Sequence, residues 1–232
     1  MGQKYYKYKY PHPAVTVDCA VMGIISNHLH VALIQRKNEP FKNQWALPGG
    51  FVGIEEALED AVKRELKEEL TIELKHLEQI GAFGNPNRDP RERVISVAYY
   101  SLIKTNDLLL QANDDALNYQ WFYIRDLPTL AFDHTQIIDC LLKRLNEKIK
   151  CSPFGIELLP EKFKLSSLQN IYEDILGRGI DKSNFRKKLS QYKLLIPLEE
   201  LEKNCANRPS RLYKFNVENY LKLSTKDISL FY

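Results

Sequence analysis

The sequence predicts an α/β fold, with a mixed sheet between helices, followed by a smaller helix-turn-helix domain of the winged type. Two patterns carry this prediction. Up to residue 150, β-branched runs alternate with amphipathic helical segments; later, two short helices flank a glycine turn and precede two short strands. A chain of 232 residues exceeds the usual size of one domain, so two modest domains can each bury a core.

Residues 1–13 form a basic and aromatic N-terminal arm, because Lys alternates with Tyr until a pair of prolines. From Ala14 onward β-branched residues alternate, and a turn at Asn27 and His28 leads into a second apolar run. These patterns predict two strands joined by a hairpin.

The next segment predicts a glycine-rich loop, two further strands and two amphipathic helices. Apolar positions at helical spacing follow the pair Gly49-Gly50, and Asp133 is a plausible N-cap for the second helix. The predicted elements are a helix over 56–70, strands over 94–103 and 119–124, and a helix over 133–150.

The run Ser152-Pro153-Phe154-Gly155 breaks this helix and places a domain boundary near residue 152. The sequence therefore predicts three parts: the arm over 1–13, an α/β domain over 14–150 and a winged helix-turn-helix domain over 151–232.

Composition excludes several classes of protein. Four cysteines occur without a CxxC pair, which argues against a zinc site and a disulfide framework and indicates a reducing, cytoplasmic compartment. The longest apolar stretch, residues 17–25, is too short to cross a bilayer and contains Asp18, so no membrane association is expected.

The net charge of +3 is distributed unevenly. From Cys151 onward, 14 Lys and Arg oppose 10 Asp and Glu, whereas 19 oppose 20 in residues 1–150. The basic excess in the C-terminal third favours a polyanionic partner, although a solvated helix face has the same composition.

Three glutamates in the first helix are candidate metal ligands. Glu65, Glu68 and Glu69 stand at i, i+3 and i+4, which places their carboxylates on one face. Mg²⁺ prefers such oxygen ligands and can bridge a diphosphate to protein. An acidic helix paired with its own Lys and Arg explains the spacing equally well.

The wider segment resembles the box of the Nudix hydrolase family. The matching positions are Gly50, Glu56, Arg64, Glu65, Leu66, Glu68, Glu69 and Ile72; Thr71 stands where the family has glycine. The resemblance implies a Nudix domain over about residues 14–148, with Mg²⁺ held by Glu65, Glu68, Glu69 and the Gly49 carbonyl. It also implies that Arg64 orients these catalytic glutamates. At Thr71 we expect altered loop geometry rather than lost ligands.

An arginine-rich loop precedes the strand that begins at Val94. Arg88, Arg91 and Arg93 suit a diphosphate, because guanidinium groups bind phosphate oxygens in pairs, although an ordinary surface loop is the alternative. The runs RKNEPFKNQWALPGGFV, RDPRERVISVAYY and LAFDH resemble the ADP-ribose branch of the Nudix family. That resemblance implies that Arg36 and the arginine loop face the ligand, with His134 at a helix start or a dimer contact.

The C-terminal third predicts a helix over 165–176, a turn at Gly177-Arg178-Gly179 and a basic helix over 181–192. Two short strands, 194–196 and 212–215, suggest a wing. A helical dimerisation domain would explain the apolar periodicity but not the clustered bases. The candidate DNA-binding residues are Lys182, Asn184, Arg186, Lys187 and Lys188 in the helix and Arg208 and Arg211 in the wing.

This third, with RPSRLYKF in the wing, resembles the winged helix of the Nudix-related transcriptional regulators. The resemblance implies a dimeric repressor of NAD or sugar metabolism genes that binds operator DNA and senses ADP-ribose or a related nucleotide. The alternative is an Mg²⁺-dependent ADP-ribose pyrophosphatase with an accessory tail, because all three helix glutamates are present.

Overall fold

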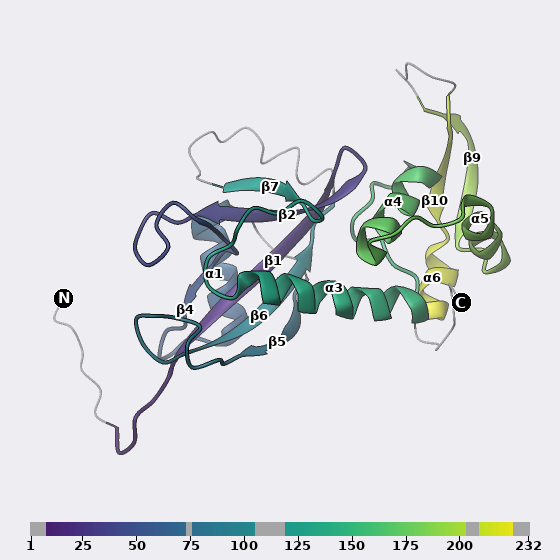
Figure 1. The fold of residues 1–232 in the computed structure, drawn as a ribbon. Coiled ribbons are helices and arrows are strands. Elements are labelled where there is room, and N and C mark those ends of the chain that lie inside the picture. The colour runs from purple at the N-terminus through teal and green to yellow at the C-terminus, as the bar shows by residue number, and fades with distance from the viewer. Residues whose placement is uncertain (1–7, 73–75, 105–118, 203–208, 225–232) are drawn as a thin grey trace.

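The computed structural model describes residues 8–72, 76–104, 119–202 and 209–224. Figure 1 shows a larger N-terminal domain built on a mixed sheet, with a smaller domain at the far end of helix α3 (His134–Cys151). Within the described ranges, no helix is long and apolar enough to cross a membrane. Arg208 and the first seven residues of the predicted arm lie outside these ranges.

The N-terminal sheet is organised around β1 (Ala14–Ile25), which is buried along most of its length. It pairs parallel to β6 (Val94–Leu102) and antiparallel to two other strands. The sheet is completed by β2 (His28–Gln35), β3 (Trp45–Ala46), β4 (Gly49–Phe51), β5 (Glu78–Phe83) and β7 (Tyr119–Tyr123). The sequence analysis predicted β1, β2, β6 and β7 but not β3, β4 and β5, two of which are only two or three residues long.

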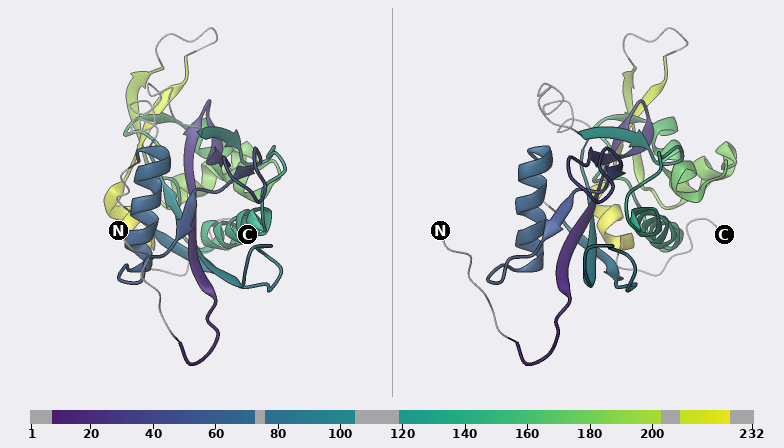
Figure 2. Two further views of the ribbon diagram at one scale, coloured as in Figure 1. Left: turned by 90° about the vertical axis from the view of Figure 1, so that its left-hand side faces the viewer. Right: turned by 60° about the vertical axis from the view of Figure 1, so that its left-hand side comes forward.

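Helices cover both faces of this sheet, as Figure 2 shows. Helix α1 (Leu58–Leu70) buries Val62 and Leu66 against one face, and α3 buries Ile137 and Leu141 against the other. The predicted mixed sheet between helices is confirmed. The two faces of the sheet have different neighbours, because only α3 continues toward the C-terminal domain.

Two helix starts differ from the prediction. Helix α1 begins at Leu58 rather than at residue 56, since the carboxylate of Glu56 instead accepts the N–H of Gly53 at 3.0 Å and binds Arg64. Asp133 does occupy the N-cap position of α3, but its side chain makes no capping hydrogen bond. It binds Arg88 instead.

The C-terminal domain has the predicted winged helix-turn-helix arrangement. Its three-stranded sheet has the order β8-β10-β9. In the chain, β8 comes before the two helices of the helix-turn-helix, and β9 and β10 come after them. The elements are β8 (Phe163–Lys164), α4 (Leu165–Leu176), α5 (Lys182–Gln191), β9 (Leu195–Leu201), β10 (Arg211–Phe215) and α6 (Val217–Ser224). The sequence analysis did not anticipate β8 and α6.

Local interactions explain the two helices of this domain. Helix α4 ends because Gly177 adopts the left-handed conformation, with φ of 69°. Helix α5 starts at the N-cap Asp181, whose carboxylate accepts the N–H of Asn184 at 2.7 Å. Phe185 and Leu189 turn one face of α5 into the core and leave the basic face outside.

One hydrophobic core extends from the N-terminal domain into the C-terminal domain. It includes Leu29 of the first hairpin, Ile149 near the end of α3, and Leu168 and Ile171 of α4. The winged helix therefore packs directly against the sheet domain and is not connected to it by a linker alone.

Candidate functional site

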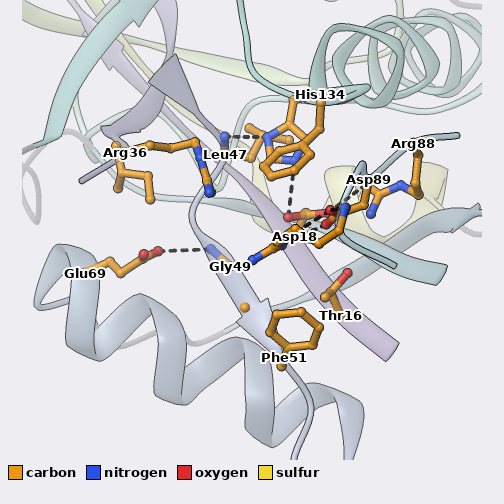
Figure 3. Close-up of a pocket in the computed structure, with 14 residues that line it drawn as sticks. Thr16, Asp18, Arg36, Leu47, Gly49, Phe51, Glu69, Arg88, Asp89 and His134 are labelled. Atoms are coloured by element: carbon orange, nitrogen blue, oxygen red, sulfur yellow. Dashed lines mark hydrogen bonds and ion pairs between the residues drawn. The ribbon is translucent and has the colours of Figure 1, made fainter. Parts of the chain in front are cut away.

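A pocket opens on the N-terminal domain where β1, β4 and the start of α3 meet (Figure 3). Its volume is about 190 Å³. It is lined by Thr16, Asp18, Ile34, Arg36, Leu47, Gly49, Gly50, Phe51, Glu69, Arg88, Asp89, Arg91, Phe132 and His134. Five of the residues predicted for ligand or metal contact thus reach one cavity from separate parts of the chain: Arg36, Gly49, Glu69, Arg88 and Arg91.

Arg88 lines this pocket, but its guanidinium group is occupied within the protein. Its side chain is 3% exposed and donates to both carboxylate oxygens of Asp133, at 2.6 and 3.0 Å. It also lies 3.3 Å from Asp18. Burial opposes its charge, yet the hydrogen bond to Asp133 and the charge of Asp18 leave the pKa of Arg88 above its ordinary value. Arg88 therefore joins β1 to the start of α3.

His134 is held in a defined tautomer beside this ion pair. Its Nδ1 accepts the N–H of Leu47 at 2.9 Å, so the proton is on Nε2, which faces Asp18 at 3.4 Å. Burial lowers the pKa of His134, against the opposing influence of Asp18. As predicted, it stands at a helix start, and its side chain is only 4% exposed.

Two other guanidinium groups lie at the cavity and share an aromatic ring. The guanidinium carbons of Arg36 and Arg91 lie 4.6 and 5.8 Å from the centre of the Phe132 ring. Burial and the charge of Arg91 lower the pKa of Arg36. A pair of cations beside an aromatic face can bind a diphosphate next to a planar base.

Arg93 takes no part in this arrangement. It donates to the carbonyl of Val94 at 3.2 Å and is not among the residues lining the pocket. Arg93 is exposed on the protein surface just before β6. Its position therefore does not support the expectation that it faces the ligand.

The three predicted glutamates of α1 differ in their surroundings. Glu69 reaches the pocket and accepts the N–H of Gly49 at 2.9 Å, whereas the Glu68 side chain is 60% exposed. The carboxylate of Glu65 packs on Gly50, where an added Cβ would lie 2.2 Å from Oε1. A larger residue at position 50 would have to displace the Glu65 carboxylate.

Arg64 holds two of the carboxylates near the end of the glycine loop. It donates to Glu65 at 2.6 Å and, through two nitrogens, to Glu56 at 2.8 and 3.0 Å. These bonds, followed by the backbone N–H of Gly53, lower the pKa of Glu56 to about 2. The predicted orienting role of Arg64 is consistent with these contacts.

Burial and neighbouring carboxylates determine the electrostatics of Glu69. Burial, followed by repulsion from Glu65, Asp18 and Glu68, raises its pKa to about 7 despite the hydrogen bond from Gly49. Carboxylate oxygens are the donors that a hard divalent cation prefers, so the chemistry of the set fits such an ion. Among the described residues, however, no three His, Cys, Asp or Glu side chains are grouped closely enough to hold a metal, so the glutamates would have to reorient.

Thr71 keeps the geometry that glycine supplies in the family pattern. It adopts a left-handed conformation, with φ of 57° and ψ of 24°, and its N–H donates to the carbonyl of Leu66. The expectation of altered loop geometry is wrong at this residue, because threonine accepts the strained conformation that ends α1.

A second candidate surface lies on α5 of the winged helix. Lys182, Asn184, Arg186 and Lys187 are exposed, and Lys188 is half-buried. Arg211, at the start of β10, is also exposed, whereas Arg208 falls in the part of the chain that the structure does not describe. Four basic side chains of α5 are therefore wholly or partly exposed, while Phe185 and Leu189 are buried.

Asp18 and Phe132 are among the pocket residues that the sequence did not predict. Asp18 is the single charged residue in an otherwise apolar run over 17–25, which is the signal that could have identified it. A carboxylate inside a buried strand needs a partner, and here Arg88 and Ser96 supply it. Phe132 carries no comparable signal, since its role depends on arginines from two other segments.

Comparison with known proteins agrees with both parts of the structure. A NUDIX domain model matches residues 16–145, and a model of the NrtR DNA-binding winged helix domain matches residues 155–215. The chain is 36% identical to the ADPR responsive transcriptional repressor NtrR of Acinetobacter baylyi, over 94% of this chain and 88% of that protein.

Two further similarities differ in how much of the chain they cover. An ADP-ribose pyrophosphatase of Methanocaldococcus jannaschii is 46% identical over 133 residues, which are 57% of this chain and 75% of that enzyme. The crystal structure of Shewanella oneidensis NrtR complexed with a 27mer DNA is similar over 92% of this chain and 99% of that one, with a TM-score of 0.74 and 31% identity. By its two matched domains and its similarity over nearly the whole chain, this protein belongs to the NrtR family of Nudix-fused winged-helix transcriptional regulators.

Proposed function

We propose that this protein is a DNA-binding repressor whose affinity for operator DNA responds to ADP-ribose bound in the Nudix pocket. The observation that carries the proposal is the exposed basic face of α5, on a winged helix that packs against the pocket domain. A positively charged recognition helix serves phosphate and base contacts in DNA. It has no use in the hydrolysis of a small molecule.

ADP-ribose suits the pocket by its chemistry. Its diphosphate would meet Arg36 and Arg91, and its adenine has an aromatic neighbour in Phe132. Arg88 would act indirectly, because its guanidinium is buried between Asp133 and Asp18, whereas that of Arg91, although paired with Asp89, is partly exposed. The relatives named for ADP-ribose response and ADP-ribose hydrolysis support this choice of ligand.

The DNA contacts would divide by chemistry. Asn184 and Arg186, near the start of α5, are our candidates for base edges, and Lys187, Lys188 and the wing arginines for phosphates. We propose a homodimer, because two copies of α5 related by a twofold axis would read a palindromic operator with half-sites one or two helical turns apart. A DNA-bound regulator implies a cytoplasmic location.

A divalent cation, Mg²⁺ in our proposal, would be held by Glu65, Glu68, Glu69 and the Gly49 carbonyl. When bound, it would neutralise the diphosphate and the crowded carboxylates. Hydrolysis of ADP-ribose was the alternative from the sequence, and the similarity to a pyrophosphatase keeps it worth measuring. It ranks second, because it leaves the exposed basic residues of α5 without a role.

The proposal is tested by selecting an operator with the wild-type protein from a random-sequence duplex library and titrating it with and without ADP-ribose. The expected result is salt-sensitive, sequence-selective binding that shifts with ADP-ribose. Lys187→Ala should weaken binding, whereas the matched control Lys63→Ala, which removes one charge from exposed α1, should not. Release of AMP from ADP-ribose with Mg²⁺, without any selected DNA sequence, would support the enzyme instead.

A further inference from the structure

The carboxylate of Asp174, in α4, is buried where the C-terminal domain meets the N-terminal domain. Its side chain is 4% exposed and accepts the N–H of Leu29 at 2.8 Å and the hydroxyl of Tyr123 at 2.8 Å. Nδ1 of His28 lies 3.1 Å from the same carboxylate. Three groups of the β1–β2 hairpin and β7 thus meet one side chain of the C-terminal domain. Figure 1 shows the tip of this hairpin beside α4.

Arg125, two residues beyond the end of β7, holds the end of the same helix. Its guanidinium donates to the carbonyls of Asp174 and Ile175 at 2.5 and 2.6 Å. These carbonyls lie in the last turn of α4, where helices lack internal donors and favour positive charge. Gly177 allows this approach, because an added Cβ there would lie 3.0 Å from the guanidinium.

The C-terminal end of α4 also contacts the turn that follows it and α5, the proposed recognition helix. The carboxylate of Glu173 accepts the N–H of Ile180 at 2.9 Å, which fixes the turn between the helices. The ring of Tyr172 packs edge-on against Phe185 of α5, with centroids 5.4 Å apart. Any shift of the end of α4 is therefore passed to α5.

From Arg125 a short segment leads directly to the ligand pocket. Seven residues farther on, Phe132 lines the cavity, followed by Asp133 and His134 at the start of α3. The segment is anchored on the way, since the N–H of Ala131 donates to the carbonyl of Trp45 at 2.8 Å. Arg125, which binds the end of α4, and the pocket residues Phe132 and His134 thus belong to one continuous segment.

We propose that Arg125 and Asp174 form a joint through which occupancy of the pocket sets the orientation of α5, and hence the affinity for DNA. The inference rests on the proposed function, because it assumes that ADP-ribose and operator DNA bind the same molecule. Ligand contact at Phe132 displaces the segment over 125–132, and Arg125 transfers the displacement to the last turn of α4. The joint transmits the signal without touching either ligand, so Arg125 and Asp174 are positioning residues.

The test measures three affinities for each full-length variant: ADP-ribose alone, operator alone, and operator at saturating ADP-ribose. The ratio of the two operator affinities is the coupling, which is roughly 5- to 150-fold in typical allosteric proteins. The variants are Arg125→Ala and the milder Tyr123→Phe, which removes one hydroxyl donor to Asp174. The matched control is Arg144→Ala, since Arg144 also donates to a carbonyl, that of Ile80, but within the N-terminal domain.

Arg125→Ala is expected to bind ADP-ribose as the wild type does and to lose most of the coupling. Tyr123→Phe should lose part of it and Arg144→Ala none. If Arg125→Ala fails to fold, Tyr123→Phe decides. Wild-type coupling that persists undiminished in the folded variants would overturn the joint and leave the proposed function standing. A wild-type ratio of one would instead reject the ADP-ribose response, and the joint with it.

Discussion

The guanidinium of Arg88 and the carboxylate of Asp133 form a two-pronged ion pair, 2.6 and 3.0 Å long, beneath the ligand pocket. The residues are 45 positions apart in the chain and are both buried. The pair ties the arginine loop to the first residue before α3, and Asp18 of β1 approaches it from the other side. An arginine that sequence motifs assign to the ligand is thus a structural part of the pocket wall.

Loss of this arginine should destabilise the protein. Arg88→Ala leaves two buried carboxylates without a partner, and breaking a buried ion pair on one side costs about 3 to 5 kcal/mol. Urea unfolding measures the change. Arg93→Ala is the matched control, because Arg93 is exposed and donates to the backbone carbonyl of Val94. Equal midpoints for the two variants would show that the buried pair adds no stability.

Arg36 and Arg91 should instead control ligand affinity. Losing a charged hydrogen bond costs about 1.5 to 3 kcal/mol, or roughly tenfold to a hundredfold in affinity for ADP-ribose. Calorimetry on Arg36→Ala and Arg91→Ala checks this, with Arg93→Ala again as control. Weaker binding in the control, with full affinity in the other two, would place the diphosphate elsewhere.

Thr71→Gly should stabilise the protein. Threonine is held at φ of 57°, and a left-handed conformation costs an L-residue about 1 to 2 kcal/mol. Glycine removes this cost but gains freedom in the unfolded chain, so the net gain is expected at about 0.5 to 1 kcal/mol. Thermal unfolding measures it, and Thr71→Ala, which keeps the strain, should show no such gain.

Glu69 should make stability depend on pH. Its folded-state pKa of about 7 exceeds its ordinary value of 4.5, so folding binds a proton between these values. The stabilisation is fully present below pH 4.5 and is lost as the pH rises through 7. At pH 8 without divalent cations, Glu69→Gln should therefore be more stable than the wild type by up to about 3 kcal/mol, since each pKa unit is worth about 1.4 kcal/mol. A difference of the same size at pH 4 would contradict the shift.

Two residues of α5 should respond differently to salt. Lys187→Ala should weaken binding to all DNA and reduce the salt slope by about one unit, because it removes one phosphate contact. Asn184→Ala should cost about 1 to 3 kcal/mol on the operator alone, because it removes a base contact. Fluorescence titrations at several salt concentrations separate the two effects. If both variants bind as the wild type does, α5 is not the recognition helix.

The sequence by itself determined the elements whose causes are local. The helical spacing of apolar residues located α4 and α5, Gly177 and Asp181 marked where one helix ends and the next begins, and the glutamates of α1 identified the family box. Each of these signals lies within a few residues of the structure that it specifies.

Only the tertiary structure decided how the charged residues are used. Arg88 and Arg93 are five positions apart and chemically identical, yet one is buried between Asp133 and Asp18 and the other lies outside the pocket. The hydrogen bonds from Arg125 to α4 could not be predicted from the sequence either, since the accepting carbonyls are about fifty residues away in the chain. The physical reason is that the partner of a charge depends on which distant segments the sheet and the core bring together, and no local pattern records that packing.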